Sequence, residues 1–489
     1  MITRLTFLLL ALLAAPAATF AQAAAKGLEH SVVTIDITRK QYDYLRPWIK
    51  SSHSANKTGV VIGPREILTT AEDIHDLTLA RLQRDGRGAW SDAKVLWVDF
   101  HSNLALIGCD DAAFWKDLKP VALANPMPSN QPFQIVRWRN GNLENRKAEF
   151  SQFTVDDVGL GWVDHLEMEL SSEIKAAGEG DPVIIGSKVA GLVAAQTGST
   201  CKVLPSSFIK PILDAHRAGT YRGLGYFHFI WQVSQNPASL RHLKLAGDPR
   251  GVIVSEVPKK GGMDTAIKPL DIILQIDGFE IDNEGYYHDP EYGHLILENL
   301  ATRKHWAGDK IKIKVSREGK ELDLLYELPK AEFTSKALTD QILNAEPEYL
   351  IAGGFVFQPL TKPFLRSWGA DWKRNAPFRL SYYDNDSSSV DRPGLVVLSA
   401  VLPDPSNIGY QDARYLVVDT INGVKITSLK DIQGALKQPK DGVHQVQFMR
   451  GDSLQHMVLD AASLDQATAR ITGRYGISEA VQINDSKAN

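Results

Sequence analysis

Three polar residues, Glu72, Asn103 and Glu179, lie beside short apolar stretches of the chain. Two carboxylates repel each other wherever a fold brings them into one site, so one of them then becomes protonated or a cation lies between them. Paired carboxylates also catalyse glycoside hydrolysis. Nothing in this sequence indicates a sugar-binding groove, however, and two glutamates with one asparagine make an incomplete set of metal ligands. These residues therefore predict no metal and no cofactor.

The elements that must position these residues are mostly short strands. Residues 28–205 contain brief apolar runs separated by turns, which is typical of an all-β sandwich or barrel. Residues 206–219 have helical spacing instead, with Phe208, Ile209, Ile212 and Leu213 on one face. A second β-rich unit follows, and its pattern over 251–278 returns over 394–426. That repeat predicts two copies of one small module.

The N-terminus has the features of a secretory signal peptide over residues 1–23. Arg4 precedes an apolar run from Phe7 to Ala15, and small residues end at the A-x-A sequence of Ala21–Ala23. The run is shorter than the ~20 residues that a membrane span needs. We therefore expect an exported protein without a membrane span after signal cleavage, most simply in a bacterial periplasm.

The overall composition excludes several classes of partner. The 489 residues include 54 Lys and Arg against 58 Asp and Glu, a net charge of −4. This near-balance argues against nucleic acid as a partner, because a polyanion would not be attracted. The two cysteines, Cys109 and Cys201, are too few for a disulfide framework. They either pair in an oxidising compartment or remain as two buried thiols, and both possibilities stay open.

The order of these units resembles the HtrA/Deg family, in which a trypsin-like double β-barrel precedes PDZ modules. ILTTAE (67–72) resembles the family's "ILTxAH", DFHSNLAL (99–106) resembles "DxxxDLAL", and AGEGDP (177–182) followed by GLV (191–193) resembles "GNSGGP…GVV". The resemblance covers most of the mature chain. It implies a mainly β fold with a trypsin-like domain at 28–218, a PDZ domain at 219–330, a connecting helical and extended segment at 331–392, a PDZ-like domain at 393–462 and a C-terminal tail at 463–489.

The resemblance places the family's catalytic triad at three substituted positions. Glu72 stands for the histidine, Asn103 for the aspartate and Glu179 for the serine. The triad needs a hydroxyl to attack, an imidazole to take its proton and a carboxylate to orient that imidazole. A carboxylate of pKa ~4 is a poor base for a serine, and position 179 offers no hydroxyl. The resemblance therefore implies a pseudoprotease with no catalytic residues.

A displaced triad is the alternative to this interpretation. His75 and His101 lie close in sequence to the substituted positions, and Ser171 and Ser172 precede Glu179. A misplacement of even ~1 Å costs a catalytic group heavily, so geometry decides whether any of them could act. The alternative function is accordingly a serine-type endopeptidase with displaced or unconventional residues.

The first PDZ module carries the expected peptide site at Gly223, Leu224, Gly225, Tyr226 and Phe227. A PDZ domain adds a peptide as a strand and holds its terminal carboxylate on backbone N–H groups. The two glycines would let the loop turn its amides inward, and Leu224 and Tyr226 would line the side-chain pocket. The alternative is an ordinary turn into a strand.

The remaining expectations concern assembly and partners. The second copy lacks a glycine loop, since Arg392-Pro393 restricts the chain there, and 349–360 with 407–410 resembles a Deg branch in which this module serves assembly. The resemblance implies trimer-based homo-oligomers formed through the barrels, where aromatics such as Trp48 would be buried. Peptide or protein C-termini, and an active protease beside this chain, are the predicted partners.

Overall fold

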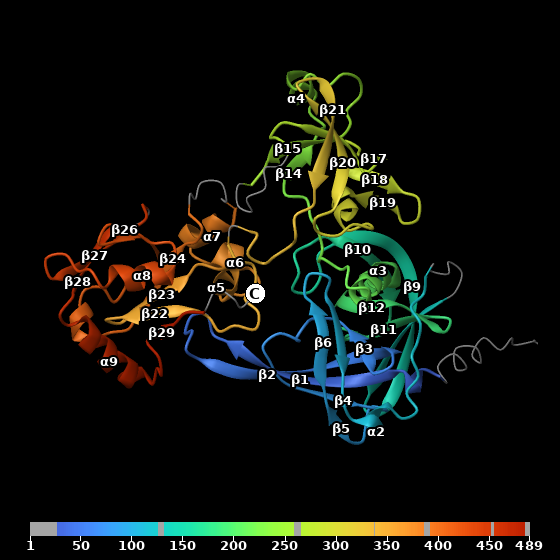
Figure 1. The fold of residues 1–489 in the computed structure, drawn as a ribbon, viewed down its shortest axis with the longest axis horizontal. Coiled ribbons are helices and arrows are strands. Elements are labelled where there is room, and N and C mark those ends of the chain that lie inside the picture. Colours follow the sequence, from blue (N-terminus) through green and yellow to red (C-terminus); the bar gives the residue numbers. More distant parts are fainter. Residues whose placement is uncertain are drawn as a thin grey trace, which may run out of the picture.

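The computed structural model describes residues 27–125, 132–258, 266–336, 338–385, 392–450 and 454–484. The predicted signal peptide, 1–23, lies outside the described residues. Figure 1 shows three β-rich units: a barrel unit, a first module above it and a C-terminal module at its side. Within the described ranges, no helix is both long enough and apolar enough to cross a membrane.

The first half of the barrel unit is an antiparallel sheet in the order β5-β4-β1-β2-β3-β7-β6. A 3-10 turn, η1 (Leu28–His30), precedes it, and α2 (Ala112–Trp115) follows it. Its strands are β1 (Val32–Tyr42), β2 (Lys50–Gly63), β3 (Glu66–Thr69), β4 (Leu77–Gln83), β5 (Trp90–Asp92), β6 (Lys94–Asp99) and β7 (Leu104–Gly108).

The second half closes into a barrel in the order β10-β13-β12-β11-β8-β9. The predicted helix follows it as α3 (Ser206–Arg217), with its apolar face buried. The strands of this barrel are β8 (Phe133–Arg139), β9 (Asn142–Asp156), β10 (His165–Ser172), β11 (Pro182–Ile185), β12 (Lys188–Thr197) and β13 (Thr200–Pro205).

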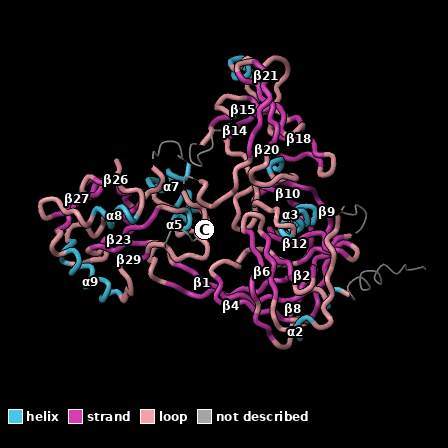
Figure 2. Tube along the Cα trace, in the orientation of Figure 1, coloured by secondary structure: helices cyan, strands magenta, loops and turns pink. Residues whose placement is uncertain are grey.

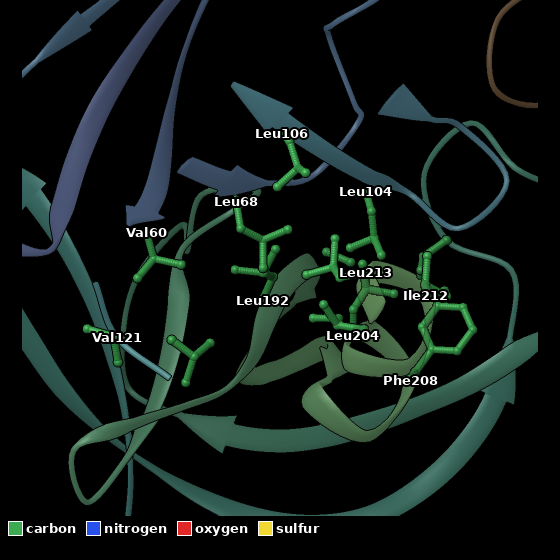
Figure 3. Packing of buried hydrophobic residues seen from close by; sticks show 14 of the residues in the cluster. Val60, Leu68, Leu104, Leu106, Val121, Leu192, Leu204, Phe208, Ile212 and Leu213 are labelled. Atoms are coloured by element: carbon green, nitrogen blue, oxygen red, sulfur yellow. The ribbon is translucent and has the colours of Figure 1, made fainter. Parts of the chain in front are cut away.

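One apolar cluster joins the two halves and α3. Because alternate residues of a strand point to one face, each half contributes a row of aliphatic side chains to this cluster. Figure 3 shows the side chains converging between the sheets and the helix: Val60, Leu68, Leu104, Leu106, Val121, Leu192, Leu204, Phe208, Ile212 and Leu213. Both cysteines are free and buried, and they lie in two other clusters of the barrel unit.

The first module is a sheet in the order β14-β15-β16-β20-β21, with β17 paired to β16 and a separate β18-β19 hairpin. Strand β14 lies at the edge and pairs only with β15 among the described strands. The elements are β14 (Ile230–Val233), α4 (Pro237–His242), β15 (Val252–Glu256), β16 (Ile272–Ile276), β17 (Phe279–Glu280), β18 (Tyr286–Asp289), β19 (Gly293–Ile296), η2 (Leu297–Ala301), β20 (Lys310–Arg317) and β21 (Lys320–Glu327).

The C-terminal module is a sheet in the order β28-β27-β25-β24-β23-β22-β29, with β26 paired to β25. Figure 2 shows short helices packed around it. Its elements are β22 (Tyr349–Ala352), β23 (Phe355–Pro359), α5 (Lys362–Arg366), α6 (Trp372–Asn375), α7 (Phe378–Asn385), β24 (Val396–Val401), η3 (Pro405–Asn407), β25 (Leu416–Ile421), β26 (Val424–Lys425), α8 (Leu429–Ala435), β27 (Val443–Phe448), β28 (His456–Asp460), α9 (Leu464–Tyr475) and β29 (Val481–Gln482).

The C-terminal module extends beyond both of the boundaries expected for it, 393 and 462. The segment 331–392 is not only a connector, because β22 and β23 belong to the C-terminal sheet. The segment 463–489 is not only a tail, because α9 packs on β22 and buries Ile471. Residues 335–343 lie in the segment that was expected to be helical and extended, and they form no helix in the described part of that range. Apolar spacing alone missed these strands, since their long-range pairing supplies the stabilisation.

Strand β23 has a neighbour on each side. It pairs with β24 on one edge and with β22 on the other, where Ile351 faces Val356. The outer edge of β22 pairs in turn with β29. A peptide cannot add as a strand to an edge that is already paired, so β23 offers no edge for a peptide.

The β1–β2 hairpin extends from the barrel unit to the C-terminal module (Figure 1). The side-chain amide of Gln358 donates to the backbone oxygen of Tyr44 at 3.0 Å, and Lys50 forms a 2.6 Å ion pair with Glu346. Trp48, expected in a contact between subunits, packs edge-on against Tyr349 of its own chain at 6.0 Å. The hairpin therefore holds two units of one chain together.

Candidate functional site

The turn that carries Glu179 is organised by a neighbouring acid, Asp181. Its buried carboxylate accepts from the amide of Gly178 at 2.7 Å and from the hydroxyl of Thr58 at 2.5 Å. The amide of Gly180 donates to the oxygen of Val193 at 2.8 Å. In a trypsin-like site the oxyanion hole is formed by the amides of the nucleophile position and of the residue two before it, here Glu179 and Ala177. The Ala177 amide donates to the side-chain oxygen of Gln196, so one of these two donors is already bonded within the protein.

A buried lysine faces the Glu179 carboxylate. The Lys57 ammonium donates to the backbone oxygens of Thr70, at 3.1 Å, and Glu72, and lies 3.9 Å from an oxygen of Glu179. Its side chain is 2% exposed, against 42% for Glu179. Lys57 is thus the cation that two neighbouring carboxylates require, and the Glu179 carboxylate lies toward this ammonium while its side chain stays partly exposed.

Burial shifts the ionisation of this group of three residues. It lowers the pKa of Lys57, while Glu179 and Glu72 counteract part of that shift. It raises the pKa values of Glu72 and Glu179, and the Lys57 ammonium partly offsets both shifts. The charge of Glu72 also raises the pKa of Glu179. The sequence motifs did not indicate Lys57, because it lies on a strand away from all three.

Asn103 holds the segment that carries Glu72. Its side-chain oxygen accepts from the amides of Ala71 and Glu72 at 3.0 and 3.2 Å. Its own backbone has a positive φ of 52°, and its side chain is buried. Gly159, at φ +80°, leaves room for it, since a Cβ there would lie 2.6 Å from the Asn103 amide nitrogen. Asn103 therefore has a positioning role in the fold, with no imidazole to orient.

The candidate residues of a displaced triad do not come together. His75 Nδ1 lies 2.8 Å from the Asp76 carboxylate, which gives an imidazole and acid pair. His101 is stacked on Phe333 at 4.3 Å. The Ser172 hydroxyl donates to the backbone oxygen of Lys147 at 2.8 Å. Within the described ranges, no hydroxyl is hydrogen-bonded to either histidine.

The predicted peptide loop divides into two parts. The first part, Gly223–Gly225, is held by contacts within the fold. The side chain of Leu224 is buried in the barrel cluster, and its backbone oxygen accepts from the amide of Ala331 at 3.0 Å. Gly225 forms an antiparallel β-bridge with Lys330. A Cβ on Gly225 would lie 2.8 Å from that of Leu328, so its replacement would disturb packing rather than a turn. Tyr226 and Phe227 line a cavity instead.

This cavity, of about 410 Å³, lies where the first module meets the barrel unit and the C-terminal module. Tyr226 and Phe227 continue into edge strand β14 along its wall. The sequence missed the other lining residues, since they come from separate parts of the chain: Trp162, Val163, Asp164, His228, Phe229, Ile230, Pro258, Glu298, Ala301, Ser335, Lys336, Leu338, Lys362 and Asp384. Only Tyr226 and Phe227 are shared with the predicted site.

An acidic cluster lies beside this cavity. Carboxylate oxygens of Asp156, Asp157 and Asp164 lie within 4.8 Å of one another. The Lys202 ammonium contacts Asp156 and lies 3.9 Å from the buried Glu167. Burial, followed by the charge of Glu298, raises the pKa of Asp164 to about 7.

Glu167, on β10, gives a prediction for stability against pH. Its side chain is fully buried and neither oxygen has a hydrogen-bond partner among the described residues, and burial raises its pKa to about 8. Because the pKa of Glu167 is higher in the folded than in the unfolded chain, protonation of this carboxyl stabilises the folded state at low pH. This contribution to the free energy of unfolding is lost as the pH rises through about 8. We expect Glu167→Gln to be more stable than wild type at pH 9 by about 2 kcal/mol.

Thermal melts between pH 5 and 9 measure this difference. Glu169→Gln on the same strand is the matched control, because Glu169 is partly exposed and accepts from Gln152 at 2.8 Å. Equal pH dependence for wild type and Glu167→Gln would contradict the assignment.

Comparison with known proteins matches this architecture. A PDZ domain model covers residues 339–482, the C-terminal module. The mitochondrial Do-like 11 protein of Arabidopsis thaliana is 27% identical over 92% of this chain and 75% of its own length. "Protease Do-like 2, chloroplastic" of the same plant is 24% identical over 92% of this chain and 74% of its own.

Among solved structures, a variant of the HtrA-type protease AlgW with a decapeptide superposes with a TM-score of 0.51. It is 15% identical and covers 64% of this chain and 98% of that one, and the likeness concerns the fold. The mainly β architecture with a trypsin-like fold and a C-terminal PDZ domain is therefore confirmed. The chain is a homologue of the trypsin-like proteases of the HtrA/Deg family that carry a PDZ domain.

Proposed function

We propose that this protein is an exported, non-catalytic HtrA/Deg homologue that binds peptides or protein C-termini as a scaffold, adaptor or quality-control subunit. The observation that carries the proposal is the side chain at the nucleophile position. Glu179 offers a carboxylate there, and it faces the Lys57 ammonium at 3.9 Å. A carboxylate in this place cannot act as a serine does, and Glu72 cannot serve as the imidazole.

The binding role rests on the first module. Strand β14 is an edge strand, and the side chain of Ile230 at its start is 50% exposed beside the cavity. An edge strand beside a pocket is the arrangement that PDZ domains use for strand addition. In the C-terminal module, by contrast, β22 covers the corresponding edge, which supports a structural role. The signal-peptide pattern supports a periplasmic location, and the family resemblance supports homo-oligomers.

A second candidate function is a peptidase with unconventional residues. Relatives are named as proteases, and the His75–Asp76 pair is an imidazole bonded to a carboxylate. This candidate still requires a nucleophile, and the described residues place none beside His75. Digestion of fluorescein-labelled casein distinguishes the two functions. We expect no turnover by wild type; turnover that is lost in His75→Ala or Glu179→Ala would establish the peptidase.

The binding proposal has its own test at Phe227. We expect Phe227→Ala to weaken binding of a library of C-terminal peptides by about tenfold, because the ring lines the cavity beside β14. Leu325→Ala is the control, since Leu325 is 58% exposed on β21 of the same module. Fluorescence polarisation measures affinity, and thermal melts verify folding. Equal affinities for wild type and Phe227→Ala would place the site elsewhere.

A further inference from the structure

The cavity beside β14 has an excess of acidic groups on its wall. Its lining carboxylates belong to Asp164, Glu298 and Asp384, and its lining ammonium groups to Lys336 and Lys362. Lys362 is committed to two acids, Asp340 at 2.7 Å and Asp384 at 3.2 Å. Apart from Lys362 and its partner Asp384, the charged groups named on the cavity wall are therefore two carboxylates, Asp164 and Glu298, and one ammonium group, Lys336.

Of these two acids, Glu298 gives the stronger argument for a ligand in the cavity. One of its oxygens accepts from the indole N–H of Trp231 at 2.7 Å. Its other oxygen is buried and has no hydrogen-bond partner among the described residues. A buried carboxylate oxygen without a partner is costly, and a cationic donor would satisfy it best. Burial raises the pKa of Glu298 accordingly.

The aromatic walls of the cavity suit a cation with an apolar stem. Trp162, Tyr226, Phe227 and Phe229 line it. The Lys336 ammonium already lies 4.5 Å from the centre of the Trp162 ring, so the cavity wall accommodates one lysine in this manner. Aromatic faces attract ammonium and guanidinium groups, and the methylenes of lysine or arginine pack on apolar surface.

We propose that this cavity takes the side chain of a lysine or arginine from the last residues of a peptide that adds to β14. This inference rests on the proposed peptide-binding function and names its ligand class. The peptide backbone would pair with the free edge of β14, while its cationic group would reach Glu298 and Asp164. Lys336 would partly oppose this binding, since it is the like charge at the same wall.

The experiment uses the mature full-length chain and fluorescein-labelled decapeptides of alanine. Each carries one lysine at the last, second-last or third-last position, and a matching peptide has the isosteric but neutral norleucine there. We choose pH 8 because it lies above the pKa of about 7 of Asp164. We expect at least one lysine peptide to bind about tenfold more tightly than its norleucine counterpart.

Two variants and one control make the assignment specific. Glu298→Gln keeps an acceptor for Trp231 but removes the charge, and we expect it to abolish the preference for lysine. Lys336→Gln should strengthen binding of the lysine peptide. Glu284→Gln is the control, because Glu284 is exposed on the first module and bonds Gln235 at 2.8 Å outside the cavity.

The outcomes separate this inference from the function on which it rests. If every peptide, norleucine included, fails to bind, the proposed peptide-binding function fails. If norleucine and lysine peptides bind equally, or if Glu298→Gln keeps the preference, peptide binding stands and the cationic specificity is wrong. If EDTA abolishes binding, the acids hold a metal ion and the inference is likewise overturned.

Discussion

The triple variant Glu72→His, Asn103→Asp, Glu179→Ser is expected to show no proteolysis above background. Its restored side chains would lack a working oxyanion hole, because the turn that would form it is held by bonds from its Ala177 amide to Gln196 and from its Gly178 amide to Asp181. Loss of one such donor costs about 10²–10³ in rate. Digestion of fluorescein-labelled casein measures the activity.

A fourth substitution tests that reason directly. Adding Asp181→Gly to the triple variant releases the turn from its anchor at the Gly178 amide, so that it can move toward the geometry of an oxyanion hole, and we expect activity to appear only there. Asp181→Asn is the matched control, because its side-chain oxygen still accepts from that amide. Arg137 lies 3.6 Å from the Asp181 carboxylate and keeps a partner in both variants, since it also donates to Glu144 at 3.0 Å. If the triple variant alone were as active as working family members, Asp181 would not be what blocks the site.

Replacing Lys57 with methionine is expected to destabilise the barrel unit by about 3 kcal/mol. The change keeps the volume but removes the ammonium that bonds two backbone oxygens and faces Glu179 and Glu72. This loss of stability is at the lower end of what breaking a buried ion pair costs, because the Glu179 side chain is 42% exposed and its carboxylate can be hydrated instead. Urea denaturation measures the change.

Two further variants give this prediction its control and its rescue. Lys94→Met removes a lysine whose side chain is 55% exposed and paired with Asp110 at the surface, so it should cost less than 1 kcal/mol. Adding Glu179→Gln to Lys57→Met should recover part of the loss, because no charge is then left opposite the methionine. A cost for Lys57→Met equal to that of Lys94→Met would show that the buried ammonium is not a support of the fold.

The framework of this protein could be predicted from sequence because it depends on local patterns. Apolar strands, a helix at Ser206–Arg217 and a repeated module all leave periodic signals, and the structure has them. The three substituted positions also lie in short motifs. The role of Lys57 could not be predicted from sequence, because it depends on the backbone oxygens of Thr70 and Glu72, which only the folded sheet brings to its ammonium. The cavity left none for the same reason, because its lining comes from three units.

The boundaries of the C-terminal module were missed for a related reason. Tyr349–Ala352 looks like an isolated apolar run until β29 and β23 pair on its two sides. Leu224 was likewise expected to line the peptide pocket, because the sequence alone does not show whether a leucine side chain lines a pocket or is buried in the core. Its burial in the barrel cluster shows that it belongs to the core.

The pairing of β22 with β29 has a consequence for the order of synthesis. Tyr349 pairs with Gln482, and the amide of Ile351 donates to the oxygen of Ala480 at 2.7 Å. The outer strand of this sheet therefore cannot be added until the ribosome has released residue 482. Until then the edge of β22 is uncovered, although the β1–β2 hairpin that contacts the same module was made first. Strand addition at such an edge is a route to aggregation, so nascent chains stalled before residue 480 would need protection that the finished protein does not.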